Sequence, residues 1–330
     1  MPEVKEEFKF GRVAFFGRPN AGKSTLLNAL MNVDFSATSN RPQTTRQNIK
    51  GILQHYKDGI WSGQSLILDT PGINLQRGLL ERSMHNQVQE ALDQADLCFW
   101  IADSKSLQRD MADIELDRGG ADKIPYWIAE NVKKARRASK WILILNKIDR
   151  VGKPDLLPLI ERCQTVFPDI SDIIPISAIH GKDYARSNVD AVQKVIEANL
   201  PVGSPEFPEE MWTELTERKL VENLIREAIF QMFYKEVPYK TECQVIQFLE
   251  HENKKLKPEV AAMIWVATPS LKRILVGAQG QKIKEIGIFA RKRYEEITGQ
   301  EIILKLLVKV VNGWDRSTKH LEELGFTAAP

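Results

Sequence analysis

Between residues 12 and 200 the chain alternates short apolar runs with longer amphipathic stretches. The apolar runs that predict buried strands lie at 12–16, 65–69, 97–103, 141–146 and 173–177, with a less regular edge strand at 49–56. The stretches that predict helices lie at 24–31, 79–94, 122–138 and 155–166. Strands that alternate with helices at this spacing predict an α/β domain, with a mostly parallel sheet and helices on both faces.

A second pattern begins after residues 200–208, which hold three prolines and a glycine and are typical of a linker. A long helix (213–234) is followed by strands at 241–250 and 259–268, a basic helix (281–298), a strand (301–311) and a terminal helix (314–324). This order predicts an α+β domain. The expected division is an N-terminal extension (1–10), a first domain (11–200), a linker (201–212), a second domain (213–312) and a C-terminal helix and tail (313–330).

The composition, 43% hydrophobic and 27% charged with a net charge of +2, is that of a globular protein. Cys98, Cys163 and Cys243 form no CxxC pair, which fits neither a disulfide framework nor a zinc site and suits a reducing compartment. The acidic N-terminus lacks the features of a signal peptide, and no apolar run approaches the roughly 20 residues that span a bilayer. We expect a cytoplasmic protein, and loose contact with a membrane surface stays open.

The first candidate site is GRPNAGKS, which fits the pattern GxxxxGK[ST] between a predicted strand and a predicted helix. Glycines let backbone N–H groups surround phosphate oxygens, Lys23 would neutralise the β- and γ-phosphates, and the Ser24 hydroxyl would ligate magnesium. The residues expected to line the phosphates are Gly17, Asn20, Ala21, Gly22, Lys23, Ser24 and Thr25. The alternative is a glycine-rich turn that caps a helix.

Two further motifs end predicted strands. In DTPG, Asp69 can hold magnesium through a water molecule and Gly72 can offer its N–H to the γ-phosphate. In NKID, the Asp149 carboxylate can accept hydrogen bonds from N1–H and the 2-amino group of guanine, a donor pair that adenine lacks. Taken alone, DTPG is also a good turn and NKID an exposed charged loop.

Asn146 and Lys147 complete the NKID site, with the Lys147 stem over the ring of the base, and Ser177 and Ala178 can add a backbone N–H for guanine O6 or simply cap a helix. Loops at the carboxyl ends of parallel strands are where such sheets bind nucleotides. Together these motifs predict a site for GTP or GDP with Mg²⁺.

The second domain contains a GxxG loop, which alone is weak because glycine is common. Here it lies between two short helices, and from residue 254 to 309 twelve Lys or Arg face five Asp or Glu. Such a basic loop can clamp the backbone of unpaired RNA. The predicted RNA-binding residues are Lys272, Arg273, Gly277, Ala278, Gln279, Gly280, Lys282 and Lys284. A structural turn with solvated lysines is the alternative.

The order GRPNAGKS, PQTTR, DTPG, NKID and SA, followed by the GxxG domain, resembles the Era family: a Ras-like P-loop GTPase domain followed by a type II KH RNA-binding domain. The resemblance extends from Gly11 to about Gly325. It implies that 42–47 is the first switch, with Thr44 or Thr45 sensing magnesium and the γ-phosphate, and that 72–82 is the second. Lys23, Thr44, Thr45 and Gly72 would then act in hydrolysis, with Ser24, Thr45 and Asp69 around Mg²⁺.

The resemblance also implies a function. A GTP-hydrolysing switch would bind small-subunit (16S-type) ribosomal RNA and assist assembly of the small ribosomal subunit. Peripheral association with the inner membrane is attributed to the family, and we expect a monomer with no DNA partner. The alternatives are a GTPase that acts on another RNA, such as an auxiliary of tRNA modification, and an RNA-binding scaffold with GTP as a structural ligand.

Two details bear on mechanism, and one segment departs from the family pattern. Ile73 follows DTPG where many signalling GTPases place a glutamine that orients the attacking water, which predicts slow intrinsic hydrolysis. Asn20 occupies the position that helps to ligate K⁺ in related potassium-stimulated GTPases. The segment 104–140 is longer than its usual Era equivalent and ends in a basic run, which is either an added contact or a solvated helix face.

Overall fold

The computed structural model describes residues 7–32, 45–73, 78–115, 140–180, 188–251, 253 and 256–326. The chain forms two compact units, and each unit is built from three segments that are not consecutive in the sequence. The first consists of Met1–Asn32, Gln47–Leu75 and Gln87–Glu214, and the second of Val33–Arg46, Gln76–Asn86 and Leu215–Pro330. Two short pieces from the first half of the sequence therefore belong to the second unit. The domain boundaries given above stay a prediction.

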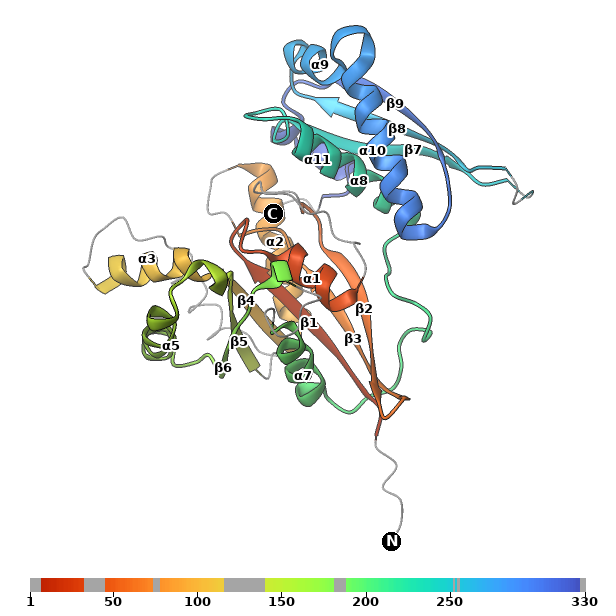
Figure 1. The fold of residues 1–330 in the computed structure, drawn as a ribbon. Coiled ribbons are helices and arrows are strands. Elements are labelled where there is room, and N and C mark those ends of the chain that lie inside the picture. Colours follow the sequence, from red (N-terminus) through yellow and green to blue (C-terminus); the bar gives the residue numbers. More distant parts are fainter. Residues whose placement is uncertain are drawn as a thin grey trace. The chain divides into compact units, whose positions relative to one another are not determined.

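The first unit is built on a six-stranded sheet (Figure 1). Its strands are β1 (Lys9–Gly17), β2 (Ile49–Lys57), β3 (Ile60–Asp69), β4 (Leu97–Asp103), β5 (Lys140–Asn146) and β6 (Asp172–Pro175), in the order β2-β3-β1-β4-β5-β6. All neighbouring strands are parallel except the edge strand β2, which is antiparallel to β3. The predicted α/β fold and its edge strand are confirmed.

Helices cover both faces of this sheet. They are α1 (Lys23–Met31), α2 (Leu79–Gln94), α3 (Ser104–Glu115), α5 (Lys153–Val166) and α7 (Val189–Asn199), with short 3₁₀ turns η1 (Ile148–Arg150) and η2 (Ala178–His180). Apolar residues of α2, α3 and α5 share one core with alternate residues of β1, β3, β4 and β5, while α1 and α7 lie together in front of the sheet (Figure 1). The helices α3 and α7 were not predicted, and the predicted helix at 122–138 falls outside the described residues.

The proline-rich stretch after α7 stays in contact with the first unit. The amide of Phe10 donates to the carbonyl of Pro201 at 3.0 Å, and the amide of Ile52 donates to that of Trp212 at 2.8 Å. The Gln64 side-chain oxygen accepts from the amides of Glu206 and Phe207. These bonds pair the segment with backbone amides of β1 and β2 and with a side chain of β3.

The second unit is an α+β layer structure. Its elements are α8 (Glu217–Met232), β7 (Thr241–Leu249), β8 (Glu259–Val266), α9 (Pro269–Val276), η3 (Ala278–Gly280), α10 (Gln281–Thr298), β9 (Ile303–Val310), η4 (Trp314–Arg316) and α11 (Thr318–Glu323). The sheet order is β7-β8-β9, with β7 antiparallel and β9 parallel to β8. The helix expected from residue 213 begins at Glu217 because the Thr216 hydroxyl caps it, accepting from the amide of Lys219.

This sheet has a core on each face, because successive side chains of a strand point to opposite sides. Ile264 and Val266 of β8 pack with α8 and α10. Trp265 packs on the other side with Trp314, with Leu321 of α11, and with Leu80 of α2. Among the helices of the described residues, none combines the length and apolar character needed to span a membrane.

Candidate nucleotide and RNA sites

The loop between β1 and α1 has a backbone that requires glycine. Gly22 has φ 97°, in the left-handed region, and a Cβ there would lie 2.1 Å from Asn146 Nδ2. At Gly17, a Cβ would lie 2.1 Å from the Ile101 carbonyl oxygen. The glycines of the motif therefore let the loop pass close to Ile101 of β4 and Asn146 of β5.

Lys23, the first residue of α1, lies inside this loop with 7% of its surface exposed. Its Nζ donates to the carbonyl oxygens of Gly17 at 3.3 Å and Arg18 at 3.2 Å. Burial lowers the pKa of Lys23 to about 8, and the Asp69 carboxylate opposes this shift. The ammonium group is thus held by the loop at the place where phosphate oxygens would compensate its charge.

The DTPG segment lies against the same loop. A Cβ on Gly72 would lie 2.9 Å from three atoms of Pro19, and the Ile73 amide donates to the Gly17 carbonyl at 2.9 Å. The Thr70 hydroxyl donates to the Phe15 carbonyl at 2.9 Å. Asp69 is fully buried at the end of β3. A carboxylate and the Ser24 hydroxyl are oxygen donors that fit Mg²⁺ bound beside nucleotide phosphates.

Asn146 connects three of the predicted loops. Its side-chain nitrogen donates to the Ala21 carbonyl at 2.8 Å, and its side-chain oxygen accepts from the amides of Lys147 at 2.8 Å and Ala178 at 3.0 Å. Sequence analysis placed Asn146 at the base only by its motif. The structure shows that its side chain joins the phosphate loop, the NKID segment and the SA turn by hydrogen bonds.

The residues predicted to read guanine lie beside Asn146. Ser177 donates through its hydroxyl to Asp149 Oδ1 at 2.5 Å, which orients the carboxylate. Lys147 has φ 61°, and its Nζ donates to the Asn20 carbonyl at 2.5 Å and pairs with Asp103 Oδ2 at 3.0 Å. The ammonium group at the end of the Lys147 side chain is thus held by two partners, which positions the stem that is predicted to lie over the base.

Asp103 was missed by the sequence analysis. Burial alone would raise its pKa, but the hydrogen bond from Lys147 and the nearby charges lower it. Asp103 is the last residue of β4, at the same edge of the sheet as the other loops. Its position at the end of a predicted strand is the feature of the sequence that could have identified it. Next to it, Arg18 pairs with Asp110 of α3 at 2.7 Å and lines a cavity of about 330 Å³.

The predicted switch residues are only partly described. Thr44 lies outside the described residues. Thr45 is buried and belongs to the second unit. The part played by either threonine at the magnesium ion therefore stays a prediction.

The GxxG loop of the second unit is η3, between α9 and α10. Gly277 has φ 74°, and a Cβ on it would meet the Lys282 side chain at 2.7 Å; Gln279 and Gly280 also have positive φ. The predicted basic residues Lys272, Arg273, Lys282 and Lys284 are all exposed around the loop. A tight turn with exposed cations on both helices suits a phosphodiester backbone.

The comparisons with known proteins agree with this geometry. A family model described as 50S ribosome-binding GTPase matches residues 12–147, and one described as KH domain matches residues 225–315. The chain is 33% identical to GTPase Era of Geotalea uraniireducens over 98% of this chain and 99% of that protein. It is 36% identical to GTPase Era of Desulfovibrio desulfuricans over 97% and 98% of the two chains.

The chain belongs to the Era family of GTPases. A crystal structure of an Aquifex aeolicus Era variant bound to GDP and AlF₄⁻ is 31% identical and matches with a TM-score of 0.84, over 97% of this chain and 100% of that one. An Era complex with MgGDPNP and nucleotides 1506–1542 of 16S ribosomal RNA also gives 31% identity and a TM-score of 0.84, over 97% and 99%. The resemblance drawn from the motifs is confirmed, as are the P-loop GTPase domain, the KH domain and GTPase activity.

Proposed function

We propose that this Era-family GTPase binds small-subunit ribosomal RNA through its KH domain and assists assembly of the small ribosomal subunit. One observation carries the proposal: 97% of the chain matches an Era whose solved structure contains both MgGDPNP and a 16S RNA segment. The convergent loops around Lys23 and Asn146 supply the nucleotide site, and the exposed cations around η3 supply the RNA site.

The phosphate site would work through residues that are already positioned. Lys23 and the loop amides would bind the phosphates, while Ser24, Thr45 and Asp69 would hold Mg²⁺, which screens the phosphate charge when bound. Gly72, packed on Pro19, would present its N–H to the γ-phosphate. Asp149, oriented by Ser177, would select guanine.

Hydrolysis without a partner would be slow. Ile73 is 2% exposed and packs in the core of the first unit, so it offers no group to orient water. Asn20 is exposed on the phosphate loop, and we propose that it helps to ligate K⁺ beside the phosphates. Turnover in K⁺ should exceed turnover in Na⁺ at equal ionic strength, and equal rates would reject the potassium site.

The assembly role is tested by crosslinking the chain to RNA in cells and by measuring phosphate release with and without ribosomal subunits. We expect 16S-type RNA in the crosslinks and faster release with small subunits. Because the model that matches residues 12–147 is described as 50S ribosome-binding GTPase, the second candidate is action on the large subunit. Stimulation by large subunits alone would favour it, crosslinks to tRNA would favour another RNA, and no release with either subunit would favour a scaffold.

A cytoplasmic location, peripheral association with the inner membrane, and a monomeric state stay predictions from the family resemblance. Cell fractionation and the mass measured in solution would test them.

A further inference from the structure

The end of the expected first switch is built into the second unit. Val33–Arg46 belongs to that unit, and Gln47 begins the next piece of the first unit. Arg46 directly follows the threonine pair of the PQTTR motif, and its side chain is completely buried. An arginine buried to this extent needs several acceptors, because an unpaired buried charge is strongly disfavoured.

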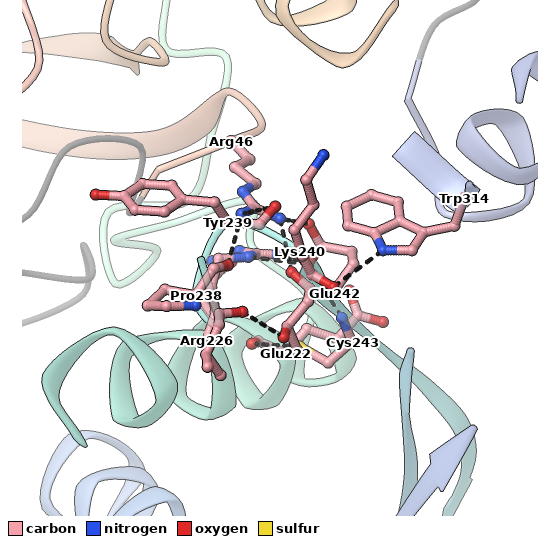
Figure 2. A network of polar contacts seen from close by, with 12 residues as sticks. Arg46, Glu222, Arg226, Pro238, Tyr239, Lys240, Glu242, Cys243 and Trp314 are labelled. Carbon is pink, nitrogen blue, oxygen red and sulfur yellow. Dashed lines mark hydrogen bonds and ion pairs between the residues drawn. The ribbon is translucent and has the colours of Figure 1, made fainter. Parts of the chain in front are cut away.

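The second unit supplies those acceptors from the start of β7 and the turn before it (Figure 2). Arg46 Nη1 donates to the Thr241 carbonyl and to Glu242 Oε2, both at 2.8 Å, and Nη2 donates to the Pro238 carbonyl at 2.9 Å. The guanidinium carbon lies 5.6 Å from the Phe230 ring centre and 5.9 Å from that of Trp314. The two terminal nitrogens of the guanidinium are thus paired with acceptors of the second unit, whereas the buried Nε has no hydrogen-bond partner among the described residues.

Glu242 already has a partner of its own. Its other oxygen, Oε1, accepts from Arg226 Nε at 3.0 Å and Nη2 at 2.6 Å, and Arg226 also donates to Asn223. Burial alone would raise the pKa of Glu242, but Arg226 and Arg46 lower it to about 2. Because Arg226 balances the Glu242 charge, the second unit does not need Arg46 to neutralise its core.

A segment that overlaps the other expected switch reaches the same part of the second unit. Gln76–Asn86 also belongs to the second unit, and Leu80, 4% exposed, shares an apolar cluster with Trp314. Trp314 is fully buried and donates through Nε1 to the Lys240 carbonyl at 3.2 Å. Both segments that adjoin the nucleotide loops in sequence are therefore fastened close to one tryptophan of the second unit.

We propose that Arg46 is a positioning residue that couples the nucleotide state of the first switch to RNA binding by the KH unit. The inference rests on the proposed function, because it takes 42–47 as the switch. Consecutive Cα atoms are about 3.8 Å apart, so Thr45 cannot move far without pulling Arg46 against the carbonyls that hold it. If Thr45 takes different positions with GTP and with GDP, Arg46 would change the RNA affinity of the KH unit between the two states. By linkage, bound RNA would then change the relative affinity for the two nucleotides by the same factor.

The test compares RNA affinity in two nucleotide states. The full chain is titrated with an RNA of nucleotides 1506–1542 of 16S rRNA, the segment in the solved Era complex, in GDP and in MgGDPNP. Wild type should show an affinity ratio in the usual allosteric range of about 5- to 150-fold. Arg46→Met, which leaves Glu242 paired with Arg226, should bring this ratio to within about twofold of unity.

The matched control is Tyr294→Phe, which removes the 2.7 Å bond from the Tyr294 hydroxyl to Glu217 between α10 and α8. This variant should lower stability but keep the wild-type ratio. If Arg46→Met does not fold, Arg46→Lys, which has the charge without the planar fork, should reduce the ratio instead.

A wild-type ratio preserved in the Arg46 variant, or a wild-type ratio of unity, would overturn the inference and leave the proposed function standing. Absence of RNA binding in wild type would overturn the proposed function, and with it this inference.

Discussion

At the scale of single residues, the site depends on a few side chains that join loops from different strands. Asn146 is the clearest example, because its two polar atoms contact the phosphate loop, NKID and the SA turn. The motifs predicted which loops would come together, and the bonds of Asn146 join three of them. They did not show Asp103 or Arg46, whose partners come from distant parts of the chain that no local pattern indicates.

Asp149 gives a prediction on base choice. Asp149→Asn replaces an acceptor of two hydrogen bonds by an amide, so affinity for GDP should fall by at least about 100-fold. Affinity for xanthosine diphosphate should rise, because its 2-oxo group can accept from the new amide. Titration with both nucleotides measures this, and Asp155→Asn, at an exposed position of α5, is the control. A variant that still prefers GDP would show that Asp149 does not read the base.

Lys23 gives a prediction on pH. Its pKa of about 8 in the free site should rise when phosphates compensate the charge, so nucleotide binding takes up a proton as the pH approaches and passes 8. GDP affinity should be flat near pH 7 and should fall above pH 8, over a range in which guanine keeps its N1–H. Calorimetry in buffers of different ionisation enthalpy measures the proton uptake. Binding without uptake at pH 8 would contradict the assignment.

At the scale of elements, hydrophobic patterning predicted the buried strands because each is a continuous apolar run. It missed α3 and α7, although Leu107 and Met111 of α3 and the buried residues of α7 recur at helical spacing. For the loops, the sequence predicted only that glycine is needed in the phosphate-binding motif. The structure adds the atoms that make glycine necessary, such as Asn146 Nδ2 at Gly22.

Gly22 and Gly59 form a matched pair for testing the loop. Both have positive φ, but a Cβ on Gly59 would meet nothing within 4 Å. Alanine at either position should cost about 1–2 kcal/mol in backbone strain. Only Gly22→Ala should also abolish GDP binding, because its Cβ would force Asn146 away from the loop. Thermal unfolding and GDP titration separate the two effects, and equal GDP affinity in the two variants would contradict this role of Gly22.

The GxxG element yields a prediction on RNA binding. Lys284→Ala removes one exposed charge from α10, so RNA affinity should weaken without regard to sequence and the salt-dependence slope should drop by about 1. GDP affinity should not change. Lys319→Ala in α11 is the control. RNA binding by Lys284→Ala at the wild-type level, with an unchanged salt slope, would count against the clamp.

At the scale of the whole molecule, the order of motifs along the chain was enough to predict a GTPase domain followed by a KH domain. The sequence did not show that residues 33–46 and 76–86 belong to the second unit. That division depends on long-range contacts such as those of Arg46 and Leu80, which composition and spacing do not encode.

The most direct test of the whole account is competition between GTP and ATP for the nucleotide-free chain at equal magnesium. Four loops arranged around a guanine-reading carboxylate predict a preference for GTP of at least about 100-fold. Equal affinity for the two nucleotides would contradict the account.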